Sequence, residues 1–465
     1  MVNIKSIAAS TLVATTVLST ATPFFANDVN ASAKVSKSTK VATCNKKTPK
    51  NVILMIGDGM GVSQLGAYRY YKDDTTKAGL SRLSFDDYLV GSHFTISDDP
   101  KLNITDSGAA GTALATGVKT YNGAISVDKN KKPVRSVLEA WKAAGKSTGL
   151  VATSELTHAT PAVFASHQAS RKEEMDIAKQ MVKKIKGKTH LVDVMLGGGV
   201  DFFKQKDKDG KVKLDLVNKL KASGYSYVTS AAQLKKDKSS KVIGLFAPSA
   251  MAKDKDRPAK EPALKDMTEA AIQKLSKNKK GFFLMVEGSQ VDWSGHANDL
   301  TGMMSEIQAF DKAYQSAMKF AKKDCNTLVI ALADHATGGL SVGSGSDYEF
   351  HPQIVDKMKM TSEGLSFELT KDGADIEKLI NDNIKIEDVT AEERAAIVDA
   401  AKAKDQQKTM FAINKIVDKR ANAGWGSLVH TGEEVHVYAY GPGSEKFRGA
   451  QENTNNAKHI FSFLK

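Results

Sequence analysis

The chain has 465 residues, a formal net charge of +13 and only two cysteines, Cys44 and Cys325. That length allows one elaborated domain, or two, with a large buried core. Its lysines lie in runs interleaved with aspartate, as in "KQKDKDGKVK" at 204–213, a pattern typical of a solvated surface. No basic run carries interleaved aromatic residues, so we expect no nucleic-acid recognition module. The basic excess favours anionic partners, such as phosphate esters or cell-wall polymers.

Residues 1–33 have the pattern of a secretory signal peptide. Lys5 gives a positive start, 7–19 is an apolar stretch, and "ASA" at 31–33 is a cleavage site of small residues. The apolar stretch is too short to span a bilayer, and no other segment comes near the roughly 18 apolar residues that a span needs. We therefore expect an exported protein without a transmembrane segment. Residues 34–50 are polar and basic and are predicted to form an N-terminal arm.

Short apolar runs that end in glycine or a polar cluster recur along the rest of the chain. They lie at 51–59, 149–155, 193–199, 242–248, 281–288, 327–335 and 435–443. Helical patterns separate them, as in 302–323, where apolar residues recur at steps of three and four. Continuous apolar strands that alternate with helices predict an α/β fold with a central, mostly parallel sheet sandwiched by helices.

One region, 341–428, departs from this alternation. Thr390 and Glu393 have the spacing of a capping box ahead of a helical pattern. We interpret 341–428 as a helical insertion or subdomain within a single catalytic domain, 51–465.

The two cysteines precede two of the predicted strands. If those strands are parallel neighbours, Cys44 and Cys325 lie at the same edge of the sheet, and a disulfide between them is a reasonable hypothesis for an exported chain.

The stretch "TDSGAAGTALATG" at 105–117 sets a serine among small residues. Asp106 or Ser107 could cap a helix here, because both side chains can accept from free backbone N–H groups. The alternative is a nucleophilic serine at a helix N-terminus, where backbone donors and the helix dipole favour an anion.

Metal-ligand residue types gather where the predicted strands end. Each alone is more often a helix cap or a structural residue, but in an open parallel sheet the carboxyl ends of the strands are the ligand-binding edge. Imidazoles and carboxylates at equivalent strand ends suit a divalent metal such as zinc, and there are enough of them for more than one ion. The residues are Asp58, His158, Thr160, Glu287, Asp292, His296, Asp334, His335 and His430.

Six motifs in this chain, in this order, resemble those of bacterial alkaline phosphatases, nearest to the exported type of Gram-positive bacilli. They are "IGDGMG", "TDSGAAGTALATG", "ATSELTHATPAVFASHQASR", "VEGSQVDWSGHAND", "ADHATGG" and "HTGEEVHVYAYGPG", and the resemblance covers essentially all of 50–465. It implies a secreted, metal-dependent phosphomonoesterase that hydrolyses a broad range of small-molecule phosphate monoesters at alkaline pH. It also implies a covalent phosphoserine intermediate and a monomer or homodimer.

The resemblance also implies roles for individual residues. Ser107 would be the nucleophile, and Arg171 would bind two phosphate oxygens. The ligands of the first zinc would be Asp292, His296 and His430. Those of the second zinc would be Asp58, Asp334 and His335. A third site, usually magnesium, would use Asp58, Thr160 and Glu287. His167, four residues before Arg171, is a candidate for orienting it.

Two positions depart from the best-known enterobacterial pattern, which has an aspartate and a lysine where this chain has His158 and Trp293. An imidazole near the third site suits Zn²⁺ or Co²⁺ better than Mg²⁺. Trp293 in the substrate-binding region in place of lysine is expected to weaken phosphate binding.

Two other classes stay open. A phosphodiesterase or nucleotide pyrophosphatase on the same metal scaffold would usually lack the third-site residues and the arginine, so Thr160, Glu287 and Arg171 favour the monoesterase. A non-catalytic phosphate- or metal-binding surface protein could lose the nucleophile, but Ser107 is intact. "TDSGAAG" is not the nucleophile motif of a sulfatase.

Overall fold

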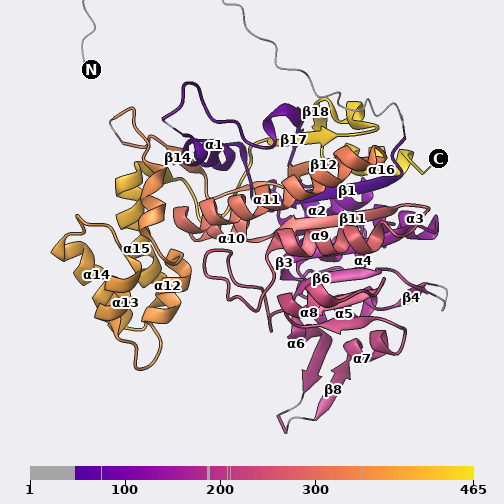
Figure 1. The fold of residues 1–465 in the computed structure, drawn as a ribbon, viewed down its shortest axis with the longest axis horizontal. Coiled ribbons are helices and arrows are strands. Elements are labelled where there is room, and N and C mark those ends of the chain that lie inside the picture. The colour runs from indigo at the N-terminus through magenta and orange to yellow at the C-terminus, as the bar shows by residue number, and fades with distance from the viewer. Residues whose placement is uncertain are drawn as a thin grey trace, which may run out of the picture. The chain divides into compact units, whose positions relative to one another are not determined.

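A ten-stranded sheet organises the chain (Figure 1). The computed structural model describes residues 48–74, 76–185, 189–206, 208–209, 211–345 and 347–464. The strand order is β18-β2-β17-β12-β1-β11-β3-β6-β10-β9. The bounds are Asn51–Gly57 (β1), Leu89–Phe94 (β2), Ser147–Glu155 (β3), Val194–Gly198 (β6), Ser226–Val228 (β9), Val242–Leu245 (β10), Phe282–Gly288 (β11), Thr327–Ala333 (β12), Val435–Tyr440 (β17) and Gly449–Glu452 (β18).

The predicted mostly parallel sheet is confirmed. Strand β17 pairs antiparallel with β12 and β2, and every other pairing in this sheet is parallel. Each of the seven apolar runs contains a strand of the sheet. The sequence patterns missed β2, β9 and β18, which are short or only partly buried.

Side chains of the central strand β1 alternate between two hydrophobic cores. Ile53 and Met55 lie in one core, with α1 (Val62–Lys72), α9 (Leu264–Leu275) and α11 (Leu300–Asp324). Val52, Leu54 and Ile56 lie in the other. Its helices are α2 (Ser107–Thr116), α3 (Val137–Ala143), α4 (Ala159–Ala165), α5 (Glu174–Met181) and α16 (Thr454–Ser462). Because successive residues of a strand point to opposite faces, helices cover the sheet on both sides.

The predicted helix at 302–323 is the core of α11. Asp299 caps its start by accepting from the Gly302 N–H at 2.9 Å. Met303, Ile307 and Phe310 are among the side chains that it buries against the sheet. Full burial of such a side chain stabilises the fold by about 1.5–3 kcal/mol.

Residues 341–428 form mostly helices, as predicted. We call this segment the helical lobe; it contains η2 (Pro352–Lys357), α12 (Ser362–Leu369), α13 (Ile376–Asn383), α14 (Ala391–Lys402) and α15 (Gln406–Ala421). Its ends meet where β14 (Leu340–Val342) pairs antiparallel with β15 (Ala423–Trp425). Thr390 and Glu393 make the predicted capping box at the start of α14. Helices α12 and α15 contact α11, and in Figure 1 the lobe lies near α10 (Gln290–His296).

The remaining elements are short helices and strands. They are η1 (Asp86–Tyr88), β4 (Lys184–Ile185), β5 (Thr189–His190), α6 (Val200–Phe203), β7 (Lys204–Lys206), β8 (Val212–Asp215), α7 (Leu216–Lys221), α8 (Ala231–Lys236) and η3 (Ser444–Phe447). Among the described residues, no helix is both long and apolar enough to cross a bilayer. Cys325 is disulfide-bonded, whereas its predicted partner Cys44 and the predicted signal peptide lie outside the described residues.

Candidate active site

Acidic residues lie at the ends of the three central strands of the sheet, at the same edge: Asp58 and Asp334 follow β1 and β12, and Glu287 is the residue before the last of β11. In the pairing of β1 with its neighbours, Gly57 is opposite Gly288 of β11 and Ala333 of β12. Asp58 therefore leaves β1 between the ends of β11 and β12, where Glu287 and Asp334 lie. All three side chains are fully buried. Such an edge is the usual ligand-binding position of an open parallel sheet.

Ser107 is the first residue of α2, and its side chain faces this edge. Asp106 caps the helix by accepting from the Ala109 N–H at 2.9 Å, which decides between the two predicted caps. The Ser107 hydroxyl oxygen lies 3.2 Å from Nε2 of His335. Every residue of α2 is buried, which explains the run of small side chains after Ser107. The serine thus lies at the positive end of a helix and beside a histidine, a position that favours a negatively charged oxygen.

We call Asp292, His296 and His430 the first of three groups of candidate metal ligands; single donor atoms of Asp292, His335 and His430 also lie within 4.8 Å of one another. Helix α10 places Asp292 and His296 one turn apart, as predicted. Nε2 of His296 and Nε2 of His430 are 3.1 Å apart, and each lies 3.4 Å from an oxygen of Asp292. Ligands held tetrahedrally at about 2.0–2.1 Å from a zinc ion are about 3.3 Å from one another. The two Nε2 atoms lie at such a spacing from each other, and each lies at such a spacing from a different oxygen of Asp292, so the distances are in the range expected around zinc.

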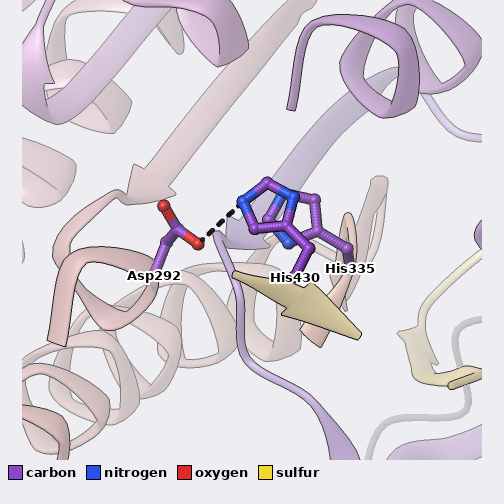
Figure 2. Close-up of side chains that lie close together, drawn as sticks. All are labelled: Asp292, His335 and His430. Carbon is purple, nitrogen blue, oxygen red and sulfur yellow. Dashed lines mark ion pairs between the residues drawn. The ribbon is translucent and has the colours of Figure 1, made fainter. Parts of the chain in front are cut away.

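A short strand pair brings His430 to this group. Strand β13 (Ala336–Thr337) pairs with β16 (His430–Thr431), so that Thr337 is opposite His430. The ring of His430 stacks on that of His335 with centroids 3.6 Å apart (Figure 2). Figure 2 also shows Asp292 facing the His430 ring across the ion pair.

Asp58, Asp334 and His335 form the second group. Nε2 of His335 lies 3.4 Å from Asp58 Oδ1 and 3.3 Å from Asp334 Oδ2, again the spacing expected around zinc. All three side chains are fully buried. The same Nε2 faces the Ser107 hydroxyl, so a metal held here would lie beside Ser107.

The third group shares Asp58 with the second. Single donor atoms of Asp58, His158 and Glu287 lie within 4.8 Å of one another. The Thr160 hydroxyl donates to Asp58 Oδ2 at 3.2 Å, which puts Thr160 beside this group as predicted. A carboxylate-rich group with one imidazole can hold magnesium, zinc or cobalt.

Several buried oxygen and nitrogen atoms that could bind a metal in these groups make no hydrogen bond. They are Asp58 Oδ1, His158 Nδ1, Glu287 Oε1 and Asp334 Oδ2. An unpaired buried polar atom costs about 1–3 kcal/mol, and more when it is charged. Burial followed by neighbouring carboxylates raises the pKa of Asp58 well above its usual range. Burial likewise raises the pKa of Glu287 to about 8 and that of Asp334 to about 7. Divalent cations would satisfy these atoms and supply the missing positive charge, so the residues fit the metals.

Burial keeps two of the imidazoles, His335 and His158, in the neutral form that binds metal, whereas contacts with Asp292 outweigh burial and raise the pKa of His296 and His430. Burial lowers the pKa of His335 well below its usual value and that of His158 to about 3. Burial alone would also raise the pKa of Asp292, but hydrogen bonds with His296 and His430 hold it well below its usual range. Asp292 is therefore the ionised carboxylate of the first group.

Arg171 is held beside the site by two partners, Asp106 and His158. One guanidinium nitrogen donates to Asp106 Oδ2 at 2.9 Å, and the other lies 2.8 Å from Nε2 of His158. The His158 ring in turn packs edge-on against Trp293, with centroids 5.6 Å apart. This fixes the plane of the guanidinium, whose fork can bind two oxygens of a phosphate.

The predicted role of His167 in orienting Arg171 is wrong. His167 contacts the Ser126 carbonyl oxygen at 2.8 Å and Glu139 at 3.0 Å. The orienting contacts come instead from Asp106 and His158. Sequence reasoning found the capping role of Asp106 but missed its second one, which depends on a residue 65 positions away.

Thr337 is a second residue that the sequence patterns missed. Its hydroxyl donates to Asp292 Oδ1 at 2.5 Å and lies 3.3 Å from Nδ1 of His335. It therefore links the first two groups and helps to fix both ligands. Its only signal in the sequence is its place in "ADHATGG".

Comparison with known proteins identifies the family. The family model for alkaline phosphatase matches residues 49–465. Alkaline phosphatase 4 of Bacillus subtilis is 51% identical over 423 residues, which cover 90% of either chain. The crystal structure of the cold-active alkaline phosphatase from the psychrophile Shewanella sp. superimposes with a TM-score of 0.81 at 36% identity. That match covers 89% of this chain and 100% of the other.

A second similar structure is a variant of TAB5 alkaline phosphatase, in which a histidine is replaced by aspartate and Mg is bound in the M3 site. Its TM-score is 0.65 at 31% identity, over 90% of this chain and 99% of the other. Motifs, fold, metal-ligand groups and relatives agree: this chain is a member of the alkaline phosphatase family, a family of metal-dependent phosphomonoesterases.

Proposed function

We propose that this enzyme hydrolyses phosphate monoesters in two displacements through a phosphoserine at Ser107. The observation that carries the proposal is the position of Ser107. Its hydroxyl lies at the N-terminus of α2, 3.2 Å from a histidine of the second group, and on the same edge of the sheet as the first group. Two adjacent metal sites are the usual device for in-line displacement at phosphorus.

In the first displacement, the Ser107 oxygen attacks phosphorus and the ester oxygen departs on the opposite side. Arg171 binds two non-bridging oxygens of the phosphoryl group and orients it for in-line attack. Backbone N–H groups at the start of α2 face the negative charge that develops there. Asp106 keeps the guanidinium in place throughout.

In the second displacement, water attacks the phosphoserine from the side of Asp292, His296 and His430, and the Ser107 oxygen leaves. Metal ions bound in the first two groups would lower the pKa of the attacking hydroxyl or water and stabilise the departing oxygen. Residues of this chain hold that arrangement rigid: Thr337 contacts both Asp292 and His335.

We assign two Zn²⁺ to the first two groups and Mg²⁺ to the third, with Zn²⁺ or Co²⁺ as alternatives there. The donor spacing of 3.1–3.4 Å supports zinc in the first two groups. His158 supports zinc or cobalt in the third, because imidazole is a softer ligand than carboxylate. The TAB5 variant that holds Mg in its M3 site has an aspartate in place of a histidine, in keeping with this preference.

We further propose that the enzyme is exported through the segment 1–33 and works at alkaline pH. The basic surface, with a net charge of +13, would hold it to an anionic cell wall. Washing cells with increasing salt tests the last point, since an electrostatically bound enzyme is released as charges are screened. Enzyme that stays on the cells at high salt would count against wall binding by charge.

Hydrolysis of p-nitrophenyl phosphate and bis-p-nitrophenyl phosphate from pH 7 to 11 tests the proposed activity. The assay is run before and after chelation, and zinc and magnesium are then restored separately. We expect fast monoester cleavage above pH 8 that is lost with the metals and regained with zinc. Preference for the diester would make the enzyme a phosphodiesterase, and inactivity with metals bound would contradict the roles assigned above.

A further inference from the structure

Helix α10 carries two ligands of the first group, and a buried lysine lies behind it. Lys253 is only 5% exposed and comes from the segment between β10 and α9. Its ammonium donates to the Ser294 hydroxyl at 3.0 Å and pairs with Glu363 of α12 at 3.1 Å. A lysine is rarely buried unless its charge is paired, so the ion pair with Glu363 is what allows Lys253 to be buried here.

Ser294 is the point where this lysine meets the metal-ligand helix. It lies between Asp292 and His296, but on the face of α10 turned away from the metal groups. Its hydroxyl donates to the Gln290 carbonyl at 2.9 Å while it accepts from Lys253. Ser294 is fully buried, so no water can take the place of the ammonium without rearrangement.

The helical lobe holds the same helix at two further points. Asp299, just after α10, accepts from the Glu363 N–H at 3.3 Å. Asn414 of α15 donates to the Ala297 carbonyl, the C-cap of α10, at 2.7 Å. Lys253 therefore belongs to a set of contacts that join α10 to α12 and α15.

We propose that Lys253 is a positioning residue for the first metal group: it fixes α10 against the helical lobe, so that Asp292 and His296 meet His430 at zinc-binding spacing. The inference rests on the proposed role of these three residues as zinc ligands. Outer contacts that orient metal ligands are commonly worth 10- to 100-fold in metal affinity. The lobe would thus contribute to zinc retention without touching the metal.

The test measures zinc affinity of the metal-stripped full-length protein by competition with a chromophoric chelator, together with kcat and KM for p-nitrophenyl phosphate at saturating zinc. Lys253→Met removes the charge and keeps the length of the side chain. Because Lys253 contacts no ligand directly, we expect zinc affinity to fall by about three- to tenfold, the low end of what contacts behind metal ligands contribute, with activity largely regained at high zinc. Glu363→Gln leaves the lysine in place and should lower zinc affinity by a smaller factor. It provides a second test of the same contact if Lys253→Met fails to fold.

Lys274 offers a matched control. It is another buried lysine, 4% exposed, which pairs with Asp237 at 2.5 Å, away from the metal groups. Lys274→Met should lower thermal stability but leave zinc affinity within about twofold of wild type. Equal zinc affinity in Lys253→Met and wild type, or an equal loss in Lys274→Met, would overturn the proposed role. A wild-type protein that binds no zinc would instead overturn the proposed function.

Discussion

The Nε2 atoms of His296 and His430 face each other at 3.1 Å, and neither ring is free to turn away. Nδ1 of His296 lies 2.7 Å from the Leu428 carbonyl oxygen, and Nδ1 of His430 lies 2.8 Å from the Thr105 carbonyl oxygen. A carbonyl oxygen only accepts, so both Nδ1 atoms carry a proton, and in the neutral rings both Nε2 atoms present lone pairs. Burial lowers the pKa of both rings, but their contacts with Asp292 outweigh it and raise the pKa, so either protons or a metal ion can supply positive charge between these Nε2 atoms and the carboxylate.

Replacing His296 by alanine should therefore remove the first zinc rather than merely weaken binding of substrate. With one of three protein ligands gone, we expect bound zinc to fall by about one equivalent and kcat/KM to fall at least 100-fold at micromolar zinc. Metal analysis of dialysed protein and the p-nitrophenyl phosphate assay check both. His351→Ala is the control, since His351 is exposed and pairs with Glu349. Full zinc content in His296→Ala would refute the assignment.

The two roles of Asp106 can be separated by two substitutions. Asp106→Asn keeps an oxygen that can cap α2 but loses the charge that holds Arg171, so we expect a several-fold rise in KM and in the phosphate inhibition constant with little change in Tm. Asp106→Ala should show the same kinetic defect and also lose about 1 kcal/mol of stability from the missing cap. Ser136→Ala, which uncaps α3 outside the site, should lower Tm alone. An unchanged KM in Asp106→Asn would contradict the anchoring role.

Trp293 is predicted to keep phosphate binding weak. A lysine at this position, next to the His158 that contacts Arg171, would add a positive charge near the phosphate. We expect Trp293→Lys to lower the inhibition constant for inorganic phosphate several-fold and to slow product release. Steady-state inhibition measured at fixed ionic strength tests this. An inhibition constant that stays the same or rises would rule out the explanation.

Asp418 of the helical lobe is predicted to make the enzyme less stable at alkaline pH. Burial raises its pKa to about 7 from 3.8, so the folded protein binds this proton more tightly than the unfolded chain. Stability from this group is complete below about pH 4 and is lost as the pH rises to about 7. At about 1.4 kcal/mol per pKa unit, the loss is at most about 4 kcal/mol.

Asp418→Asn removes that titration. The gain in Tm over wild type should be small near pH 4 and largest above pH 8, as followed by thermal unfolding across this range. Asp399→Asn, an exposed change on the neighbouring helix α14, should shift Tm equally at all pH values. A gain in Asp418→Asn that does not depend on pH would contradict the buried titration.

The positions of Asp58, Glu287 and Asp334 could be predicted because each follows a continuous apolar run. Such runs predict buried parallel strands, and parallel strands that lie side by side bring their ends to one edge. The i, i+4 spacing of Asp292 and His296 likewise predicts one face of a helical turn. Local patterns were sufficient for these residues.

Other features depend on contacts that no local pattern encodes. His430 reaches the first group through the pairing of β13 with β16, two strands of two residues each. The antiparallel direction of β17 cannot be told from an apolar run alone. Asp106 and Lys253 act through partners distant in sequence, and the pairing of His167 with Glu139 needed the structure to exclude it from the site.

The proposed covalent step at Ser107 can be tested by trapping the phosphoserine. The enzyme is mixed with a phosphate monoester, quenched in acid and digested, and the mass of the peptide containing 105–117 is measured by mass spectrometry. Ser107→Ala is the control. We expect a phosphate on Ser107 in the wild type and none in the variant, which should also lose nearly all activity. Monoester turnover with no phosphorylated Ser107, or full turnover by Ser107→Ala, would contradict it.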